Sequence, residues 1–279
     1  MANPQHVPYS PGHAPSQVKH HEWRTAENSV AYLLPHLQRS VHQNPNLQFL
    51  DVGAGSGTIT ASLARHLPLG RLTATDISAG VLARARAHAE SRGVSNVAFQ
   101  HASVYALPFA DATFDVAHAH QVLTHLDAPV DAVREMLRVT KPGGIVALRE
   151  ADMLMWCLWP EIPALLRFHE LMVGVQLANS GQVKAGRELV SWVMKAGVER
   201  GDVEASFGTW CYSKPEDRRM WGEAMIQRLL GGPMRNKALE LGIATEDELG
   251  QMVKGWEEWI VTDDATLGLI NGEVIVKKA

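Results

Sequence analysis

The sequence predicts an α/β fold with a mostly parallel sheet and helices on both faces. Three observations predict it. The apolar run Leu47–Val52 reads as a buried strand, followed by the glycine-rich turn Gly53–Gly57 and by helical spacing over Thr58–Leu67. Strand and helix patterns then alternate as far as Glu150. Asp76 ends the second expected strand, at the edge where such sheets bind nucleotides.

The composition is that of an ordinary globular protein. The chain has 279 residues, of which 46% are hydrophobic and 20% charged, enough for one large domain or one domain with a cap. A net charge of −4 and the absence of a Lys/Arg block disfavour a nucleic-acid partner. No apolar run is long enough to predict a membrane span, and the N-terminus does not have the pattern of a signal peptide. The two cysteines, Cys157 and Cys211, form no disulfide framework. We expect a cytoplasmic protein, and whether it is a monomer or a homodimer stays open.

The first 40 residues are expected to form a lid segment. Residues 1–20 are rich in Pro, His and Ser and show no periodicity, whereas His21–Leu37 has an apolar face at helical spacing. This helix could pack on the body of the protein, or it could cover a ligand and exclude water. Trp23 is then a candidate for contact with the substrate. Other candidates in the segment are Tyr9, His13 and His20.

The glycine loop is the first candidate site. Its glycines allow a tight turn and the approach of a ligand to bare backbone, and the following helix N-terminus presents free N–H groups. A dinucleotide fingerprint would need a glycine at position 58, where Thr58 stands. The third glycine comes one residue earlier, at Gly57. An NAD(P) oxidoreductase is therefore disfavoured, although it stays an alternative.

Asp76 is the second candidate, at the end of the expected strand Arg71–Thr75. A carboxylate at this edge can accept hydrogen bonds from both hydroxyls of a ribose. Asp76 could instead cap the helix expected over Ala79–Ser91, but Ser78 can supply that cap. The nearby glycine loop favours the ribose role.

Three histidines lie at and after the end of the expected strand Phe114–Ala119. They are His118, His120 and His125, and no carboxylate or cysteine completes a metal-ligand spacing with them, so we expect no metal. His118 and His125 are expected in core or capping positions, and His125 is also a candidate for substrate contact. His120 is the candidate general base, because imidazole titrates near neutral pH.

The motifs as a set resemble those of the class I S-adenosylmethionine (SAM) methyltransferases, in the branch of ubiquinone/menaquinone biosynthesis that methylates small molecules. The resemblance is specific over about residues 24–150. It implies a Rossmann-like, seven-stranded, mostly parallel sheet with helices on both faces, an N-terminal lid helix and a helical cap insertion. The features that carry it, in the family's order, are Asp51 with the loop Gly53–Gly57, Asp76, Leu107-Pro108-Phe109 and the run Arg138 to Gly144 before the expected strand Ile145–Glu150.

The resemblance also implies SAM as the cofactor and assigns residues to its parts. The adenine would lie beside Ser103 and Val104, although the family commonly has Asp where this chain has Ser103. His120 and Gln121 would face the sulfonium. The methionyl and ribose parts would be bound by Asp51, Gly53, Ala54, Gly55, Gly57, Asp76 and Ile77.

Beyond Ala151 the composition shifts, and seven of the eight tryptophans lie there. They could form the core of a cap, or they could line a pocket for an apolar or aromatic molecule, with Trp156 as a candidate contact. The expected domains are a lid (1–40), a cofactor-binding core (41–150) and the rest of the sheet with the cap (151–279, cap about 211–264). The expected elements after 159 are helices over Pro160–Leu177, Arg187–Lys195, Glu216–Leu230 and Glu246–Ile260 and strands over Val203–Trp210 and Gly272–Val276.

The sequence thus predicts an enzyme that moves a methyl group from SAM to an O, N or C atom of a small, apolar or aromatic acceptor, in secondary metabolism. The alternative is a protein that keeps the fold and cofactor without methyl transfer, with a regulatory role or a cyclisation in the cap.

Overall fold

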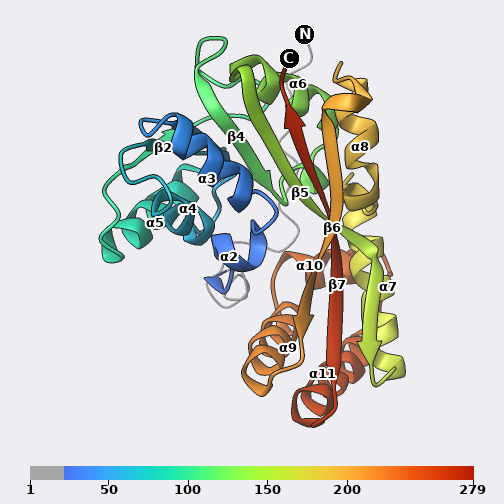
Figure 1. The fold of residues 1–279 in the computed structure, drawn as a ribbon. Helices are drawn as coiled ribbons and strands as arrows, with labels where there is room; N and C mark the ends of the chain where they lie inside the picture. The colour runs from blue at the N-terminus through green and yellow to red at the C-terminus, as the bar shows by residue number, and fades with distance from the viewer. Residues whose placement is uncertain (1–21) are drawn as a thin grey trace.

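The computed structural model describes residues 22–279, and its centre is one seven-stranded sheet in the order β3-β2-β1-β4-β5-β7-β6 (Figure 1). Neighbours from β3 to β5 are parallel, and β7 is antiparallel to both β5 and β6. The predicted fold class, a mostly parallel α/β sheet, is confirmed. The strands are β1 (Gln48–Val52), β2 (Arg71–Asp76), β3 (Val97–His101), β4 (Phe114–His120), β5 (Thr140–Trp159), β6 (Val203–Tyr212) and β7 (Thr266–Lys277).

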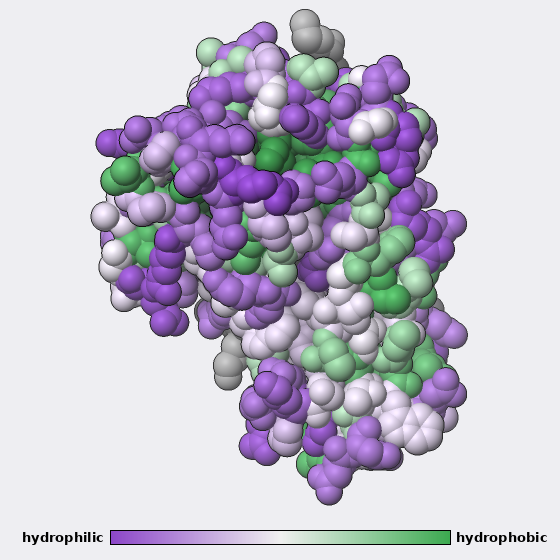
Figure 2. Space-filling model, viewed as in Figure 1, coloured by the Kyte–Doolittle hydropathy of each residue, from purple (hydrophilic) through white to green (hydrophobic). Residues whose placement is uncertain are grey.

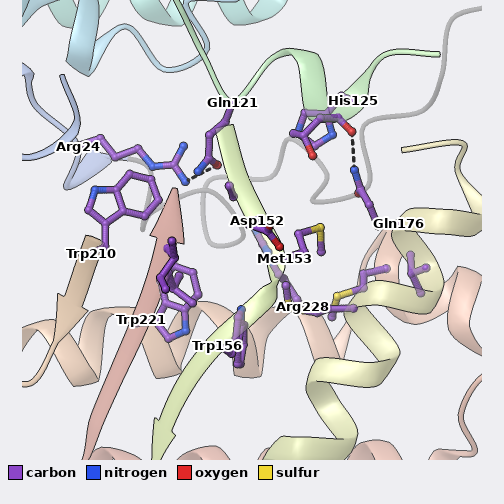
Figure 3. A pocket seen from close by; sticks show the side chains of 17 residues that line it. Arg24, Gln121, His125, Asp152, Met153, Trp156, Gln176, Trp210, Trp221 and Arg228 are labelled. Carbon is purple, nitrogen blue, oxygen red and sulfur yellow. Dashed lines mark hydrogen bonds between the residues drawn. The ribbon is translucent and has the colours of Figure 1, made fainter. Parts of the chain in front are cut away.

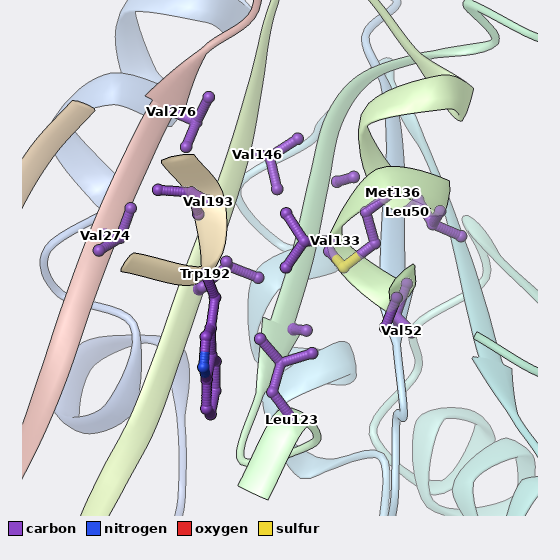
Figure 4. Packing of buried hydrophobic residues seen from close by; sticks show 14 of the residues in the cluster. Leu50, Val52, Leu123, Val133, Met136, Val146, Trp192, Val193, Val274 and Val276 are labelled. Carbon is purple, nitrogen blue, oxygen red and sulfur yellow. The ribbon is translucent and has the colours of Figure 1, made fainter. Parts of the chain in front are cut away.

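Strand β1 is the middle of the parallel part, and its two faces bury different sets of side chains. Leu50 and Val52 pack into one core with α6 (Pro129–Val139) and α8 (Ala185–Lys195), as Figure 4 shows. Phe49 packs into another core with α3 (Leu34–Gln43) and α4 (Thr58–Ala64). A strand covered on both faces reads as a continuous apolar run, as this one does. The helices on this part are α2 (Ala26–Ser29), α3 (Leu34–Gln43), α4 (Thr58–Ala64), α5 (Ala79–Ser91), α6 (Pro129–Val139) and α8 (Ala185–Lys195).

The strand register brings the candidate residues to one edge. Val52 of β1 pairs with Thr75 of β2 on one side and with Ala119 of β4 on the other. The residues that follow these strands therefore meet, which places the glycine loop between Asp76 and His120.

The single helix predicted over His21–Leu37 is wrong, because the chain forms the short α2 and then α3. Thr25 starts α2 with a capping box, in which its side chain accepts from the N–H of Asn28. Pro35 lies in the first turn of α3, so a helix can begin there but cannot run through it. Tyr9, His13 and His20 lie outside the described residues, and the lid role stays a prediction.

The three last strands continue beyond the parallel sheet into a second lobe, seen in the lower half of Figure 1. β5 runs to Trp159 because its outer part pairs with Thr266–Asn271 of β7, so it is far longer than predicted and the next helix begins at Pro163 instead of Pro160. Most of the tryptophans form the core of this lobe, including Trp256 and Trp259, which are fully buried. Its helices are α7 (Pro163–Ala178), α9 (Pro215–Leu230), α10 (Pro233–Glu240) and α11 (Glu246–Val261), the last three between β6 and β7 as the predicted insertion requires.

Figure 2 shows apolar surface along the side of this lobe where α7 lies, and α7 itself exposes Leu166 and Leu177. The boundaries of the three predicted domains stay a prediction, since the sheet runs through both lobes without a break.

A bulge in β5 shapes the junction of the lobes. Ala151 pairs with Asn271 and Trp156 pairs with Leu269, so Asp152–Met155 are set against the single residue Ile270. The extra residues swing out of the ladder. The N–H of Met153 donates instead to the carbonyl of Val183, 2.9 Å away.

Candidate functional site

The glycine loop after β1 is built from left-handed backbone. Gly53, Gly55 and Gly57 have φ of 69°, 55° and 78°, a region that side-chain-bearing residues rarely adopt. A Cβ on Gly53 would lie 2.4 Å from Val122, and one on Gly57 would lie 2.7 Å from Ala85. Among the described residues, a Cβ on Gly55 would meet only the carbonyl of Gly53, 3.9 Å away. Glycine is thus needed at 53 and 57 for packing, whereas Gly55 has no close neighbour in the described part of the chain.

Asp76 faces this loop from the end of β2. One carboxylate oxygen accepts from the N–H of Gly55 at 3.1 Å and the other from the N–H of Ser78 at 2.9 Å. Ser78, not Asp76, caps α5, with its side chain accepting from the N–H of Val81. Since Ser78 supplies the helix cap, Asp76 is not needed there and can act as a hydrogen-bond acceptor at the glycine loop. Next to it, Ile77 is 51% exposed, an apolar surface beside the same site.

Asp51 lies beneath the loop instead of facing it. Its carboxylate is 3% exposed, accepts from the Thr60 hydroxyl at 2.6 Å and lies 2.9 Å from His118 Nδ1. Asp51 thus joins β1 to α4 and β4, and His118 is a core residue as expected. Direct contact of Asp51 with the cofactor stays a prediction that this geometry does not favour.

His120 ends β4 and is 8% exposed. Its ring lies 5.6 Å from the Trp210 ring of β6. The Arg149 guanidinium lies over the same Trp210 ring, 4.4 Å from the ring centroid. Arg149 is held by Glu273, with Nε 3.0 Å from the carboxylate. The predicted general base is therefore packed in a polar, aromatic layer beside the loop, and its role in proton transfer stays a prediction.

The segment after β4 is held in place by one buried carboxylate. Glu150 is fully buried and accepts from the backbone N–H groups of Val122, Leu123 and Thr124 at 3.0, 2.8 and 3.2 Å. Burial raises the pKa of Glu150 to about 7, although these N–H groups oppose the rise. Gln121, directly before them, has a φ of 53°, a strained value for this residue type. Glu150 thus fixes the segment that carries Gln121 and His125.

A cavity of about 120 Å³, here called the junction cavity, lies between this segment and the helical lobe (Figure 3). Gln121 and His125 line it from the segment after β4, the β5 bulge contributes Asp152 and Met153, and α9 contributes Arg228. Its apolar walls are Trp156, Met172, Val175, Trp210, Trp221, Met234 and Leu269.

Gln121 connects the junction cavity to the N-terminal segment. Its side chain accepts from Arg24 at 3.2 Å and donates to Asn271 of β7 at 3.0 Å (Figure 3). Arg24 also lies over the Trp210 ring, 4.6 Å from its centroid. Val122, the next residue along the chain, lies against Gly53, so a single residue links this part of the cavity lining to the glycine loop.

The predicted substrate contacts are placed differently. His125 and Trp156 line the junction cavity, whereas Trp23 does not and packs behind its wall, on Trp210 and Tyr212. Desolvation, with the charges of Arg24 and Arg228, lowers the pKa of His125 to about 4. His125 is therefore neutral at neutral pH.

Two predicted adenine contacts occupy the turn after β3. The hydroxyl oxygen of Ser103 accepts from the N–H of Tyr105 at 3.3 Å, and Val104 packs against the core. Both stay predictions.

Sequence reasoning missed several residues of the junction cavity because they lie in unrelated segments, although the tryptophan-rich composition after Ala151 pointed to some of them. The missed residues include Arg24, Asp152, Gln176 and Arg228, whereas Trp210 and Trp221 are among the tryptophans to which the composition pointed.

Within residues 22–279, no group of three or more His, Cys, Asp or Glu side chains could hold a metal ion. No helix in this part of the chain is long and apolar enough to cross a membrane. The cytoplasmic location and the absence of a nucleic-acid partner stay predictions.

Comparisons with known proteins agree with the geometry. Residues 50–148 match a family model described as a methyltransferase domain. The chain is 32% identical to an uncharacterized methyltransferase of Schizosaccharomyces pombe, over 92% of both chains, and 30% identical to a probable methyltransferase of Aspergillus luteorubrus, over 97% of both. The solved structure of the YcgJ protein from Bacillus subtilis has a similar fold, with a TM-score of 0.55 and 17% identity, over 89% of this chain and 99% of that one.

Proposed function

The chain belongs to the class I SAM-dependent methyltransferases, and we propose from this that it methylates a small, apolar or aromatic molecule bound in the junction cavity. The observation that carries the proposal is the position of this cavity. Three tryptophans, Trp156, Trp210 and Trp221, line it, and Gln121 of its lining is followed by Val122, which lies against Gly53 of the glycine loop.

The residues at the loop fit the cofactor. The open space above Gly55 can take the methionyl part, and helix α4 directs its N-terminal N–H groups there. Asp76 has oxygens that can accept from the ribose hydroxyls, and exposed Ile77 offers an apolar surface to the adenine. When bound, SAM supplies an electrophilic methyl group on a sulfonium.

The chain's own residues have to align the acceptor and exclude water, because the donor is reactive without further activation. The aromatic walls orient a flat acceptor. The segment 121–125, held by Glu150, sets the distance between acceptor and loop. His120 would take a proton where the acceptor's nucleophile carries one.

Calorimetric titration tests the donor half of this proposal. We expect saturable binding of SAM and S-adenosylhomocysteine, and we expect turnover of labelled SAM with aromatic acceptors, detected by mass as the gain of one methyl group. Absence of saturable binding at millimolar cofactor would contradict the donor site.

The His120→Ala variant tests the general base. We expect turnover to fall by about tenfold to a hundredfold, within the usual range for acid–base catalysis, while the affinity for S-adenosylhomocysteine stays nearly unchanged. His42→Ala, an exposed histidine of α3, is the matched control. Unchanged turnover in His120→Ala would make His120 a packing residue only.

The alternative of a SAM-fold protein without methyl transfer has no observation in its favour. Methyltransferases are the relatives that match nearly the whole chain. Turnover of labelled SAM separates the two, because the alternative predicts cofactor binding without methyl loss.

A further inference from the structure

The charges around the junction cavity are unbalanced. Arg24 lines it from the N-terminal segment, and Arg228 lines it from α9 with only 7% of its surface exposed. Among the described residues that line the cavity, Asp152 carries the one carboxylate. The described lining is therefore richer in positive than in negative charge.

Asp152 does not offset these arginines, because it is committed elsewhere. Its carboxylate is 2% exposed and is bound by Arg187 of α8, with one guanidinium nitrogen 2.8 Å from Oδ1 and Nε on Oδ2. It also accepts from the N–H of Leu154. The charges of Asp152 and Arg187 are thus paired with each other at the cavity wall.

Both arginines also act on His125, another residue of the cavity lining. The charges of Arg24 and Arg228 act on His125, after burial the next causes of its lowered pKa. His125 is thus neutral at neutral pH, so that Arg24 and Arg228 are the cationic side chains of the described cavity lining. In Figure 3 both guanidinium groups are drawn among the side chains that enclose the space, together with Trp156 and Trp221.

We propose, resting on the proposed function, that the acceptor is an aromatic acid whose carboxylate is bound by Arg228, with its ring between the tryptophan walls. A guanidinium in a partly dry site binds a carboxylate through paired, charge-assisted hydrogen bonds and stacks on aromatic rings. The carboxylate serves for recognition. Since Arg228 comes from the helical lobe and Gln121 adjoins the glycine loop, the acid group is turned toward the lobe and the rest of the ring toward the methyl donor.

The methionyl part of SAM also carries a carboxylate, so the test must separate the two sources. The probes are salicylate and hydroxynaphthoate, each paired with its uncharged amide. Their affinities are measured by calorimetry on the whole chain with saturating S-adenosylhomocysteine, and the affinity for S-adenosylhomocysteine is measured separately. The variants are Arg228→Gln, Arg228→Lys and Arg24→Gln. The control is Arg219→Gln, which removes the same charge from an exposed position of the same helix.

For the wild type we expect at least one carboxylate to bind about tenfold or more tightly than its amide, the strength of a charge-assisted contact. Arg228→Gln should reduce this preference to within about twofold, Arg228→Lys should keep part of it, and Arg219→Gln should keep all of it. Arg24→Gln, at a partly exposed position, should weaken the preference without loss of the fold. Unchanged affinity for S-adenosylhomocysteine in Arg228→Gln shows that the variant is folded.

Three results would overturn the proposal. One is that no carboxylate binds more tightly than its amide, which includes no binding of any probe at millimolar concentration. Another is a preference that Arg228→Gln and Arg24→Gln leave unchanged. The third is that both variants lose affinity for S-adenosylhomocysteine and for no other ligand. That result would assign the arginines to the donor site. In each case binding of S-adenosylhomocysteine by the wild type shows that the donor site of the proposed function still stands.

Discussion

Gly55→Asp is expected to abolish cofactor binding while the fold is retained. Within residues 22–279, a Cβ at this position meets nothing closer than 3.9 Å, so the new side chain has room there, but that room is the space assigned to the cofactor. It would also bring a second carboxylate beside Asp76. We expect the affinity for S-adenosylhomocysteine to fall by at least about a hundredfold, close to 3 kcal/mol, measured by calorimetry.

The matched control is Gly93→Asp. Gly93 also has a positive φ, of 68°, and also has nothing within 4 Å of a new Cβ, but it lies in the turn after α5. Both variants bear the same backbone strain, of order 1–2 kcal/mol. If both lose affinity equally, strain and not occupation of the site is the cause, and the loop assignment fails.

Glu150→Ala is expected to give the largest loss of stability at the site. The change leaves three backbone N–H groups without their acceptor, those of Val122, Leu123 and Thr124, of which the last two residues are buried. Unsatisfied buried donors destabilise by about 1–3 kcal/mol each, so a loss of about 3–5 kcal/mol follows, measured by urea unfolding. Glu150→Gln keeps one acceptor oxygen and should lose less. A loss below about 1 kcal/mol in Glu150→Ala would show that water replaces the carboxylate.

The same carboxylate predicts a pH dependence. The pKa of Glu150 is raised from 4.5 to about 7, so the folded state holds the proton more tightly than the unfolded state. Its contribution to stability is fully present below about pH 4.5 and is lost as the pH rises to about 7, by about 3 kcal/mol. Arg149 and the three N–H groups reduce the size of this change. The difference in unfolding free energy between the wild type and Glu150→Gln should therefore shrink over this range, and a constant difference would contradict the raised pKa.

Much of the donor side could be predicted from the sequence. The order of strand, glycine loop and helix at Leu47–Leu67 and the acid at Asp76 are local patterns, because strand and helix periodicity and the need for positive φ are read within a few residues. The same local reading failed over His21–Leu37, where an apolar stripe with helical spacing covered two short helices and a turn. It also ended β5 too early, since the pairing partner that extends it lies more than a hundred residues away in β7.

The sequence by itself therefore determined the fold class and the glycine loop, since both follow from short-range backbone preferences. Only the tertiary structure decided what lies opposite that loop. Arg24, Gln121, Trp156 and Arg228 come from four separate segments, and they meet because the β5 bulge and the helices between β6 and β7 bring them to one cavity. No periodicity in the sequence predicts that these four residues lie together. Packing of the helical lobe on the extended strands selects the side chains that line the junction cavity, and among them is the buried Arg228.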